Sequence, residues 1–249
     1  KSKNGLFGDV MMEIDWSVGE IMKTLQSEGL DKNTLVVFTA DNGPWLNYGN
    51  HAGNTAGLRE GKGTSFEGGQ REPCVMRWPQ RIPAGTVCNK IASTIDLLPT
   101  IADITRSPLS GQKIDGINIL PLLSGDPDAE PRTEFVYYYN RNSLEAIRQG
   151  KWKLVFPHKS RSYKAHPPGH DGFPGPTIQI DVPFALYDLS TDPGETMDVK
   201  EQHPDVVKQL ELLADKYRSD LGDDLTHLEG TGRRPTGVCT ECKTNIRKL

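Results

Sequence analysis

Two successive stretches of apolar residues set the expected architecture of the first half of the chain. In the first stretch, apolar residues recur at the spacing of an amphipathic helix over residues 10–25, and Gly29 follows as a stop signal. These residues are Val10, Met11, Ile14, Val18, Ile21, Met22 and Leu25. The second stretch, residues 34–40, is a strand-length apolar run, which favours a strand covered on both faces. This order is typical of a layered α/β sheet, so we expect residues 34–40 to form a central parallel strand.

A second helix is expected near Asp96, with Pro99 in its first turn. Its inward-facing residues would be Leu97, Leu98, Ile101 and Ile104. Residues 124–133 are rich in proline, glycine and aspartate and predict a linker. We therefore assign residues 1–123 to a main α/β domain and residues 134–249 to a smaller C-terminal α+β subdomain.

Short strands dominate the start of the C-terminal subdomain. The predicted strands are residues 134–139, 144–148, 152–156 and 184–189. A turn at Gln149-Gly150-Lys151 would join the second strand to the third, which favours a small antiparallel sheet. Residues 203–221 carry apolar side chains on one helical face and would cover that sheet as one long helix. The insertion at residues 157–182, rich in Pro, Gly and His, receives no predicted structure.

Composition excludes two classes of partner. The 249 residues include 29 Lys and Arg against 33 Asp and Glu, a formal net charge of -4, and no dense basic stretch, so we expect no nucleic-acid partner. No window approaches the roughly 18 consecutive apolar residues of a membrane span. Among the four cysteines, Cys239 and Cys242 have CxxC spacing, but a second ligand pair for zinc and a strand-helix context for redox chemistry are missing. A local disulfide or inert thiols are favoured.

Asp41 and Asn42 follow the predicted strand directly. In open α/β sheets ligands bind at the carboxyl ends of strands, and a carboxylate beside an amide carbonyl offers hard oxygen donors that suit calcium or magnesium. The alternative is a simple turn, because Asn42-Gly43 is a common turn pair. On these residues alone, both interpretations stay open.

Lys62 lies between two glycines in the segment Gly61-Lys-Gly-Thr-Ser-Phe-Glu-Gly-Gly69. Glycines let a backbone approach an anion closely, and the ammonium supplies the countercharge. The segment is not a P-loop, because Gly63 stands where that motif has Ser or Thr after the lysine. A flexible loop with a solvated lysine is the open alternative to an anion site.

Taken together, these motifs resemble the sulfatase family, a branch of the alkaline-phosphatase-like superfamily. In order and spacing the resemblance covers residues 5 to about 221, and its segments are 8–19, 38–44, 61–73, 78–85, 94–100, 115–123, 151–154 and 186–195. It implies a layered sheet with helices on both faces, present here in part. It also implies a calcium cofactor with Asp41 and Asn42 among its ligands, and a contact from Lys62 to the substrate sulfate. The implied substrates are sulfated small molecules or sulfated sugars, and the implied location is periplasmic, extracellular or lysosomal.

One departure from the family pattern concerns the nucleophile. The family converts a Cys or Ser within a Cys/Ser-x-Pro/Ala-x-Arg element to formylglycine, and no such element occurs in these 249 residues. The resemblance places it upstream of Lys1, so the partner expected for this chain is the missing N-terminal portion of the same protein. Two alternatives remain open: a phosphomonoesterase or phosphodiesterase of the same superfamily, and a non-catalytic binding protein derived from a sulfatase.

His51 is the histidine closest in sequence to the predicted site. A surface position is the ordinary interpretation of a loop histidine, and a place in a substrate subsite is the alternative. No role is assigned to the others, which are His158, His166, His170, His203 and His227.

Overall fold

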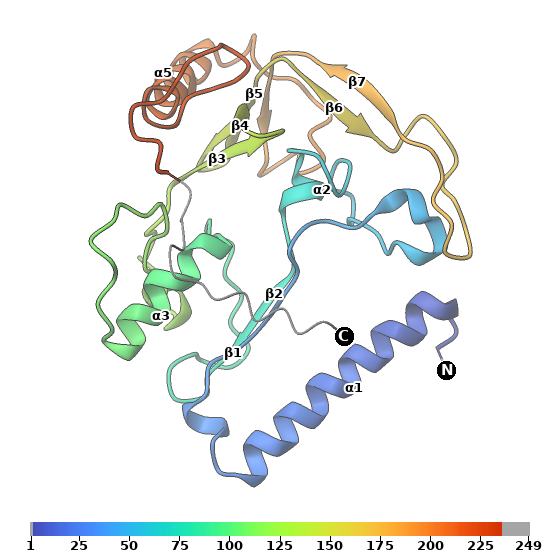
Figure 1. The fold of residues 1–249 in the computed structure, drawn as a ribbon, viewed down its shortest axis with the longest axis vertical. Helices are drawn as coiled ribbons and strands as arrows, with labels where there is room; N and C mark the ends of the chain where they lie inside the picture. Colours follow the sequence, from blue (N-terminus) through green and yellow to red (C-terminus); the bar gives the residue numbers. More distant parts are fainter. Residues whose placement is uncertain (1, 236–249) are drawn as a thin grey trace, which may run out of the picture.

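The computed structural model describes residues 2–235 (Figure 1). Helix α1 spans Gly5–Ser27, which confirms the predicted helix and begins it before the expected start. A short 3-10 turn, Asp31–Asn33, leads into strand β1, Val36–Thr39. Within the described chain no residue of α1 is buried, and several of its apolar side chains are exposed. The most exposed are Leu6, Val10, Met12, Trp16 and Ile21.

Strand β1 pairs with β2, Cys74–Arg77, and the pairing is antiparallel. The prediction that residues 34–40 form a central parallel strand is therefore wrong for the pairing seen here. The long segment after β1 turns the chain back, so that Thr39 lies opposite Cys74. In a β-α-β unit built on α1, the parallel partner of β1 would be a strand that precedes α1. The described residues before α1 are 2–4, and they form no strand. The segment between the two strands carries a 3-10 helix, Leu46–His51, and the short helix α2, Glu67–Gln70.

Helix α3, Leu97–Thr105, continues a 3-10 turn at Thr94–Asp96 and confirms the predicted second helix. Its predicted inward face is wrong for Leu98 and Ile101, which are exposed in the described structure. The buried side chains of α3 are Pro99, Thr100 and Ala102.

A polar network explains which face of α3 turns inward. The buried carboxylate of Asp96 accepts hydrogen bonds from the backbone N–H of Ser93 and Ile117, and pairs with Arg132. The Thr100 hydroxyl accepts from the backbone N–H of Ile119 at 3.0 Å. These bonds fix the polar face against residues 117–119, just before the short helix α4, Leu120–Leu123.

The four-stranded sheet and the long helix of the C-terminal part are built as the sequence predicts. Its four-stranded antiparallel sheet has the order β3-β4-β5-β8, with strands Glu134–Tyr139, Ser143–Gln149, Trp152–Val155 and Ala185–Asp188. The predicted turn is present, since β4 ends at Gln149, Gly150 has φ +55°, and β5 begins at Trp152. Helix α5, Pro204–Leu221, confirms the long covering helix. Residues 157–182 contain an unpredicted hairpin of β6, His158–Ser162, and β7, Ile178–Val182.

The two faces of this sheet carry two separate hydrophobic clusters. On one face Leu144, Leu154 and Leu186 pack against Leu210 and Ala214 of α5. On the other face the buried cluster includes Phe66, which comes from the glycine-rich segment before α2. Figure 1 accordingly shows α5 and α2 on opposite sides of the sheet. The segment that carries Lys62 therefore rests on the core of the C-terminal sheet.

Candidate active site

The end of β1 and the glycine-rich segment lie backbone against backbone. Gly43 donates its N–H to the Gly69 carbonyl at 3.1 Å, and Lys62 donates its N–H to the Pro44 carbonyl at 3.0 Å. The approach excludes side chains, because a Cβ on Gly43 would lie 1.9 Å from the Gly68 carbonyl oxygen. The glycines that look like a flexible loop in the sequence are thus required by close packing.

We call residues 61–69 the Lys62 segment. Asp41 and Asn42 therefore lie on the segment that directly contacts it. Asp41 is exposed and Asn42 is half-buried. The ammonium of Lys62 lies over the Trp45 ring, 5.5 Å from its centroid, a cation–π distance. The structure thus brings the three sequence-predicted residues into neighbouring segments.

Glu72 is a site residue that the sequence did not single out. Burial, first, and the negative charge of Asp41, second, raise the pKa of the Glu72 carboxyl. Its Oε1 atom is buried without a hydrogen-bond partner among the described residues. Two acidic side chains close enough to repel, with one oxygen unsatisfied, fit a bound cation, and calcium prefers such oxygen donors. Within residues 2–235 no group of three or more His, Cys, Asp or Glu forms a complete metal site.

Buried charged side chains contact the Lys62 segment. The ammonium of Lys153, fully buried, lies 3.1 Å from Glu67 Oε1 and 2.9 Å from Glu195 Oε1, and donates to the Ser65 carbonyl at 2.8 Å. Glu195 also accepts the backbone N–H of Glu67 at 2.7 Å, and Tyr137 donates to Glu67 at 2.9 Å. We call Glu67, Lys153 and Glu195 the buried charge cluster.

Electrostatic balance differs between the two carboxylates of the buried charge cluster. Burial raises the pKa of Glu67, but the charges of Lys153 and Arg148 and its hydrogen bonds outweigh burial, so the pKa is lowered. For Glu195 burial prevails over Lys153 and the pKa is raised. Burial alone would lower the pKa of Lys153, but the two carboxylates raise it, so the ammonium stays charged. The members of the cluster lie far apart in the chain, within segments 61–73, 151–154 and 186–195, and nothing local in these segments indicates that their charges meet.

The β6–β7 hairpin packs against residues 60–63. The buried carboxylate of Glu60 accepts the Ser162 hydroxyl at 2.8 Å and the backbone N–H of Tyr163 at 2.9 Å. The Tyr163 hydroxyl donates to the Lys62 carbonyl. A Cβ on Gly63 would lie 2.9 Å from the movable guanidinium of Arg161, and the φ of +85° at Gly63 strains any other residue at that position.

His51 lies apart from these contacts, next to the loop that joins β6 to β7. Asn47, on the same 3-10 helix, anchors that loop through bonds to Gly169 and Gly175. A Cβ built on Gly172 of that loop would lie 4.0 Å from the His51 Nδ1. The structure therefore places His51 beside the hairpin loop, and its subsite role stays a prediction.

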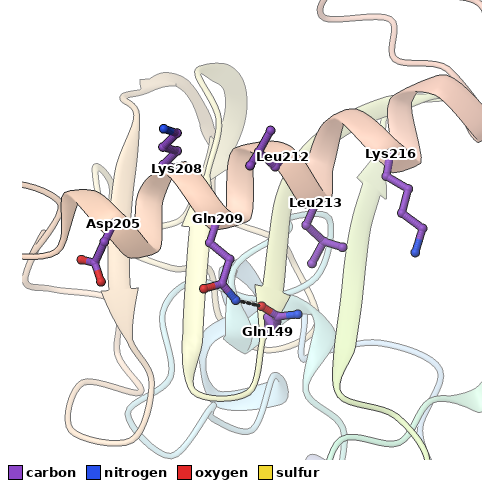
Figure 2. Close-up of a pocket in the computed structure, with 7 residues that line it drawn as sticks. All are labelled: Gln149, Asp205, Lys208, Gln209, Leu212, Leu213 and Lys216. Carbon is purple, nitrogen blue, oxygen red and sulfur yellow. Dashed lines mark hydrogen bonds between the residues drawn. The ribbon is translucent and has the colours of Figure 1, made fainter.

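Two surface hollows in the described part of the chain lie elsewhere. One, of about 460 Å³, is lined by residues of α5 and by Gln149 (Figure 2), and the other, of about 590 Å³, lies at the turn after β4. Figure 2 shows Gln209 donating to Gln149 across the first of them. Neither is lined by Asp41, Asn42 or Lys62, so neither belongs to the candidate site. No helix in the described part of the chain has the length and hydropathy of a membrane span.

Comparisons with known proteins match both halves of the chain to sulfatases. The sulfatase family model matches residues 5–107, and the model for the C-terminal region of aryl-sulfatase matches residues 131–246. Bovine arylsulfatase A is 38% identical over 229 residues, which cover 87% of this chain and 44% of that protein. An N-acetylgalactosamine-6-O-sulfatase from Bacteroides thetaiotaomicron is 34% identical over 229 residues, which cover 88% of this chain and 43% of that protein.

Solved structures show the same relationship. A sulfatase from a glycosaminoglycan-metabolising locus of B. thetaiotaomicron matches with a TM-score of 0.64 at 31% identity, over 85% of this chain and 44% of that one. A Pseudoalteromonas sulfatase matches with a TM-score of 0.72 at 25% identity, over 84% of this chain and 41% of that one. These matches confirm the predicted fold class, and the chain spans less than half the length of these relatives. Residues 2–235 thus combine two sulfatase family regions with a sulfatase fold, and the chain belongs to the sulfatase family.

Proposed function

We propose that the protein containing this chain hydrolyses sulfate monoesters to an alcohol and sulfate. The observation that carries the proposal is the backbone contact between the segment of Asp41 and Asn42 and the segment of Lys62. This contact supports the proposal because it joins a segment with hard oxygen donors to a segment with an ammonium, the two kinds of group that a divalent cation and a sulfate group together require.

Each residue has a distinct role in this proposal. Asp41 and Asn42 supply part of the ligand set of a calcium ion, and the repulsion between Asp41 and Glu72 is reduced by that ion. Calcium supplies positive charge that stabilises the negative charge of the sulfate oxygens. Lys62 contacts a sulfate oxygen. The nucleophile, a formylglycine in this proposal, comes from residues outside this chain.

The substrate class proposed is a sulfated sugar. Relatives include N-acetylgalactosamine-6-sulfatases from mammals and from B. thetaiotaomicron. The side chains of Arg161 and Tyr163 adjoin the Lys62 segment, and a guanidinium with an aromatic ring suits an anionic sugar. Export of the protein, and the domain boundary at residues 124–133, stay predictions.

The test is sulfate release by the full-length protein from 4-nitrocatechol sulfate and from N-acetylgalactosamine 6-sulfate, with and without a calcium chelator. We expect turnover that chelation lowers. Turnover of the corresponding phosphate monoester at a higher kcat/KM, with no sulfate release, would favour the phosphatase alternative.

The 249-residue chain alone is expected to have no sulfatase turnover, because it contains no residue that can become formylglycine. The apolar side chains left exposed on α1 and on α3 support a further requirement, that more of the same protein covers them. The measurement is 4-nitrocatechol release by the purified chain against a heat-killed control. Signal above that control would overturn the expectation.

Asp41→Asn in the full-length protein is expected to weaken calcium binding by roughly 10-fold or more, because one carboxylate charge is lost from a site held by charge and oxygen donors. Calcium titration by calorimetry measures this. Asp181→Asn is the matched control, since the Asp181 side chain is 86% exposed in the β6–β7 hairpin. Equal calcium affinities for the two variants would remove Asp41 from the ligand set.

A further inference from the structure

Strands β4 and β6 bring together a buried carboxylate and a buried imidazole. Glu145 Oε2 lies 3.2 Å from His158 Nε2, and the two side chains are 2% and 1% exposed. Neither atom has another hydrogen-bond partner within residues 2–235. The pair lies outside the residues to which the sulfate and calcium roles are given.

The other ring nitrogen fixes the tautomer of His158. Its Nδ1 lies 2.7 Å from the Phe156 carbonyl oxygen, and a carbonyl oxygen only accepts, so Nδ1 carries a hydrogen. A neutral ring would then present the bare Nε2 lone pair to a carboxylate oxygen. Two acceptors facing each other away from water repel, whereas one additional proton converts the contact into a hydrogen bond.

We propose that a single proton is held between Glu145 Oε2 and His158 Nε2, and that this hydrogen bond positions the Lys62 segment. The bridge has the same geometry whether the proton resides on the carboxyl or on the ring. Burial raises the pKa of the Glu145 carboxyl, while His158, Ser65 and Asn140 act in the opposite direction. Glu145 and His158 are positioning residues in this proposal and do not touch the substrate.

A β-bulge turns the Glu145 side chain toward the side of the sheet on which the Lys62 segment lies. Tyr137 pairs with Ala146 and Tyr138 pairs with Leu144, so Glu145 is the extra residue of β4. Bulges of this kind turn a side chain out of the normal alternation. Ala146 belongs to the cluster around Phe66, and the bulge brings Glu145 to that same side of the sheet.

The contact to the Lys62 segment runs through Ser65 and Phe66. The Ser65 side chain lies close enough to Glu145 to lower the pKa of its carboxyl, against the larger effect of burial, and the Phe66 ring lies 6.5 Å from the His158 ring. Both are buried, and they follow Lys62 closely in sequence. Among the described residues, the titratable group facing Glu145 is His158, and Ser65 and Asn140 add neutral polar groups.

The proton itself is tested without any enzymatic assay, so this test stands even if the proposed function fails. We expect the full-length protein, labelled with 15N-histidine, to show two exchange-protected protons that are missing in His158→Gln: the Nδ1–H bonded to the Phe156 carbonyl, and a second, deshielded proton coupled to Nε2, directly or across the hydrogen bond from the carboxyl. A spectrum with the Nδ1–H proton and no second proton coupled to Nε2 would overturn the bridge.

The positioning role rests on the proposed function and is tested by two substitutions in the full-length enzyme. In Glu145→Gln the amide N–H can donate to His158 Nε2, and the amide oxygen can accept from Asn140 and stay beside Ser65, so kcat is expected to stay near wild type. Glu145→Ala removes both contacts, and we expect kcat to fall about 10-fold or more, the scale for losing a group that orients a site residue.

The pH profile separates positioning from general damage. The wild-type rate should fall on the alkaline side as the bridging proton is lost, and Glu145→Gln should lack that decline. The proton spectrum needs only the wild-type enzyme and His158→Gln, so it decides the bridge even if Glu145→Ala fails to fold. A Gln variant as impaired as the Ala variant, or an unchanged alkaline limb, would refute the positioning role.

Discussion

Lys62→Ala in the full-length enzyme should lower kcat by roughly 10²-fold or more, the scale for losing one preorganised group that stabilises developing negative charge. The Lys62 ammonium is proposed to contact a sulfate oxygen that becomes more negative as the ester bond breaks. An interaction that strengthens in the transition state affects turnover and not only substrate affinity. Steady-state kinetics on a sugar sulfate would measure both constants.

The fold should survive Lys62→Ala. The side chain is partly exposed and lies over the Trp45 ring, so it contributes little packing, and the Tm should change little. Lys159→Ala is the matched control, because the Lys159 side chain is 74% exposed on the adjacent β6–β7 hairpin. If Lys62→Ala kept the kcat and kcat/KM of this control, Lys62 would not contact the sulfate.

The elements predicted correctly are those with a strong apolar pattern. Helix α1 and helix α5 follow from helical spacing, and the strands of the four-stranded sheet follow from apolar runs and a glycine turn. Strand β6 has no such pattern, since its inward side chains are His158, Ser160 and Ser162. Polar side chains on the buried face of a strand leave no hydrophobic alternation to detect.

The candidate site was predicted in part, and the reason lies in how its parts are held. Asp41, Asn42 and Lys62 stand in local motifs, so the sequence could name them. Glu72 could be found by the same motif, because it follows the glycine-rich segment directly, but its effect on Asp41 is a matter of distance in space. The buried charge cluster could not be predicted in the same way. Acidic and basic residues are mostly solvated, so the sequence does not distinguish a buried ion pair such as Lys153 and Glu67 from a pair on the surface.

Lys153→Met should be among the most destabilising substitutions in this part of the protein. Methionine keeps much of the volume but leaves Glu67 and Glu195 buried without their ammonium, and breaking a buried pair in this way costs about 3–5 kcal/mol. A Tm lower by roughly 10 °C is expected for a domain of this size. Thermal unfolding of the full-length protein measures it, with Lys159→Met, in an exposed pair, as the control expected to cost under about 1 kcal/mol.

The pH dependence of this loss identifies its cause. Without Lys153 the two buried carboxylates have raised pKa values, and Glu195 has one already in the intact cluster. A group whose folded-state pKa is raised favours the folded state while it is protonated and loses that contribution as the pH rises through the folded pKa. The difference in Tm between Lys153→Met and the wild type should therefore shrink as the pH falls toward the carboxyl range. Replacing Glu67 and Glu195 by Gln in the Lys153→Met background should recover part of the loss at neutral pH. A loss that is independent of pH and unaffected by the two Gln substitutions would mean that packing, and not uncompensated charge, accounts for the role of Lys153.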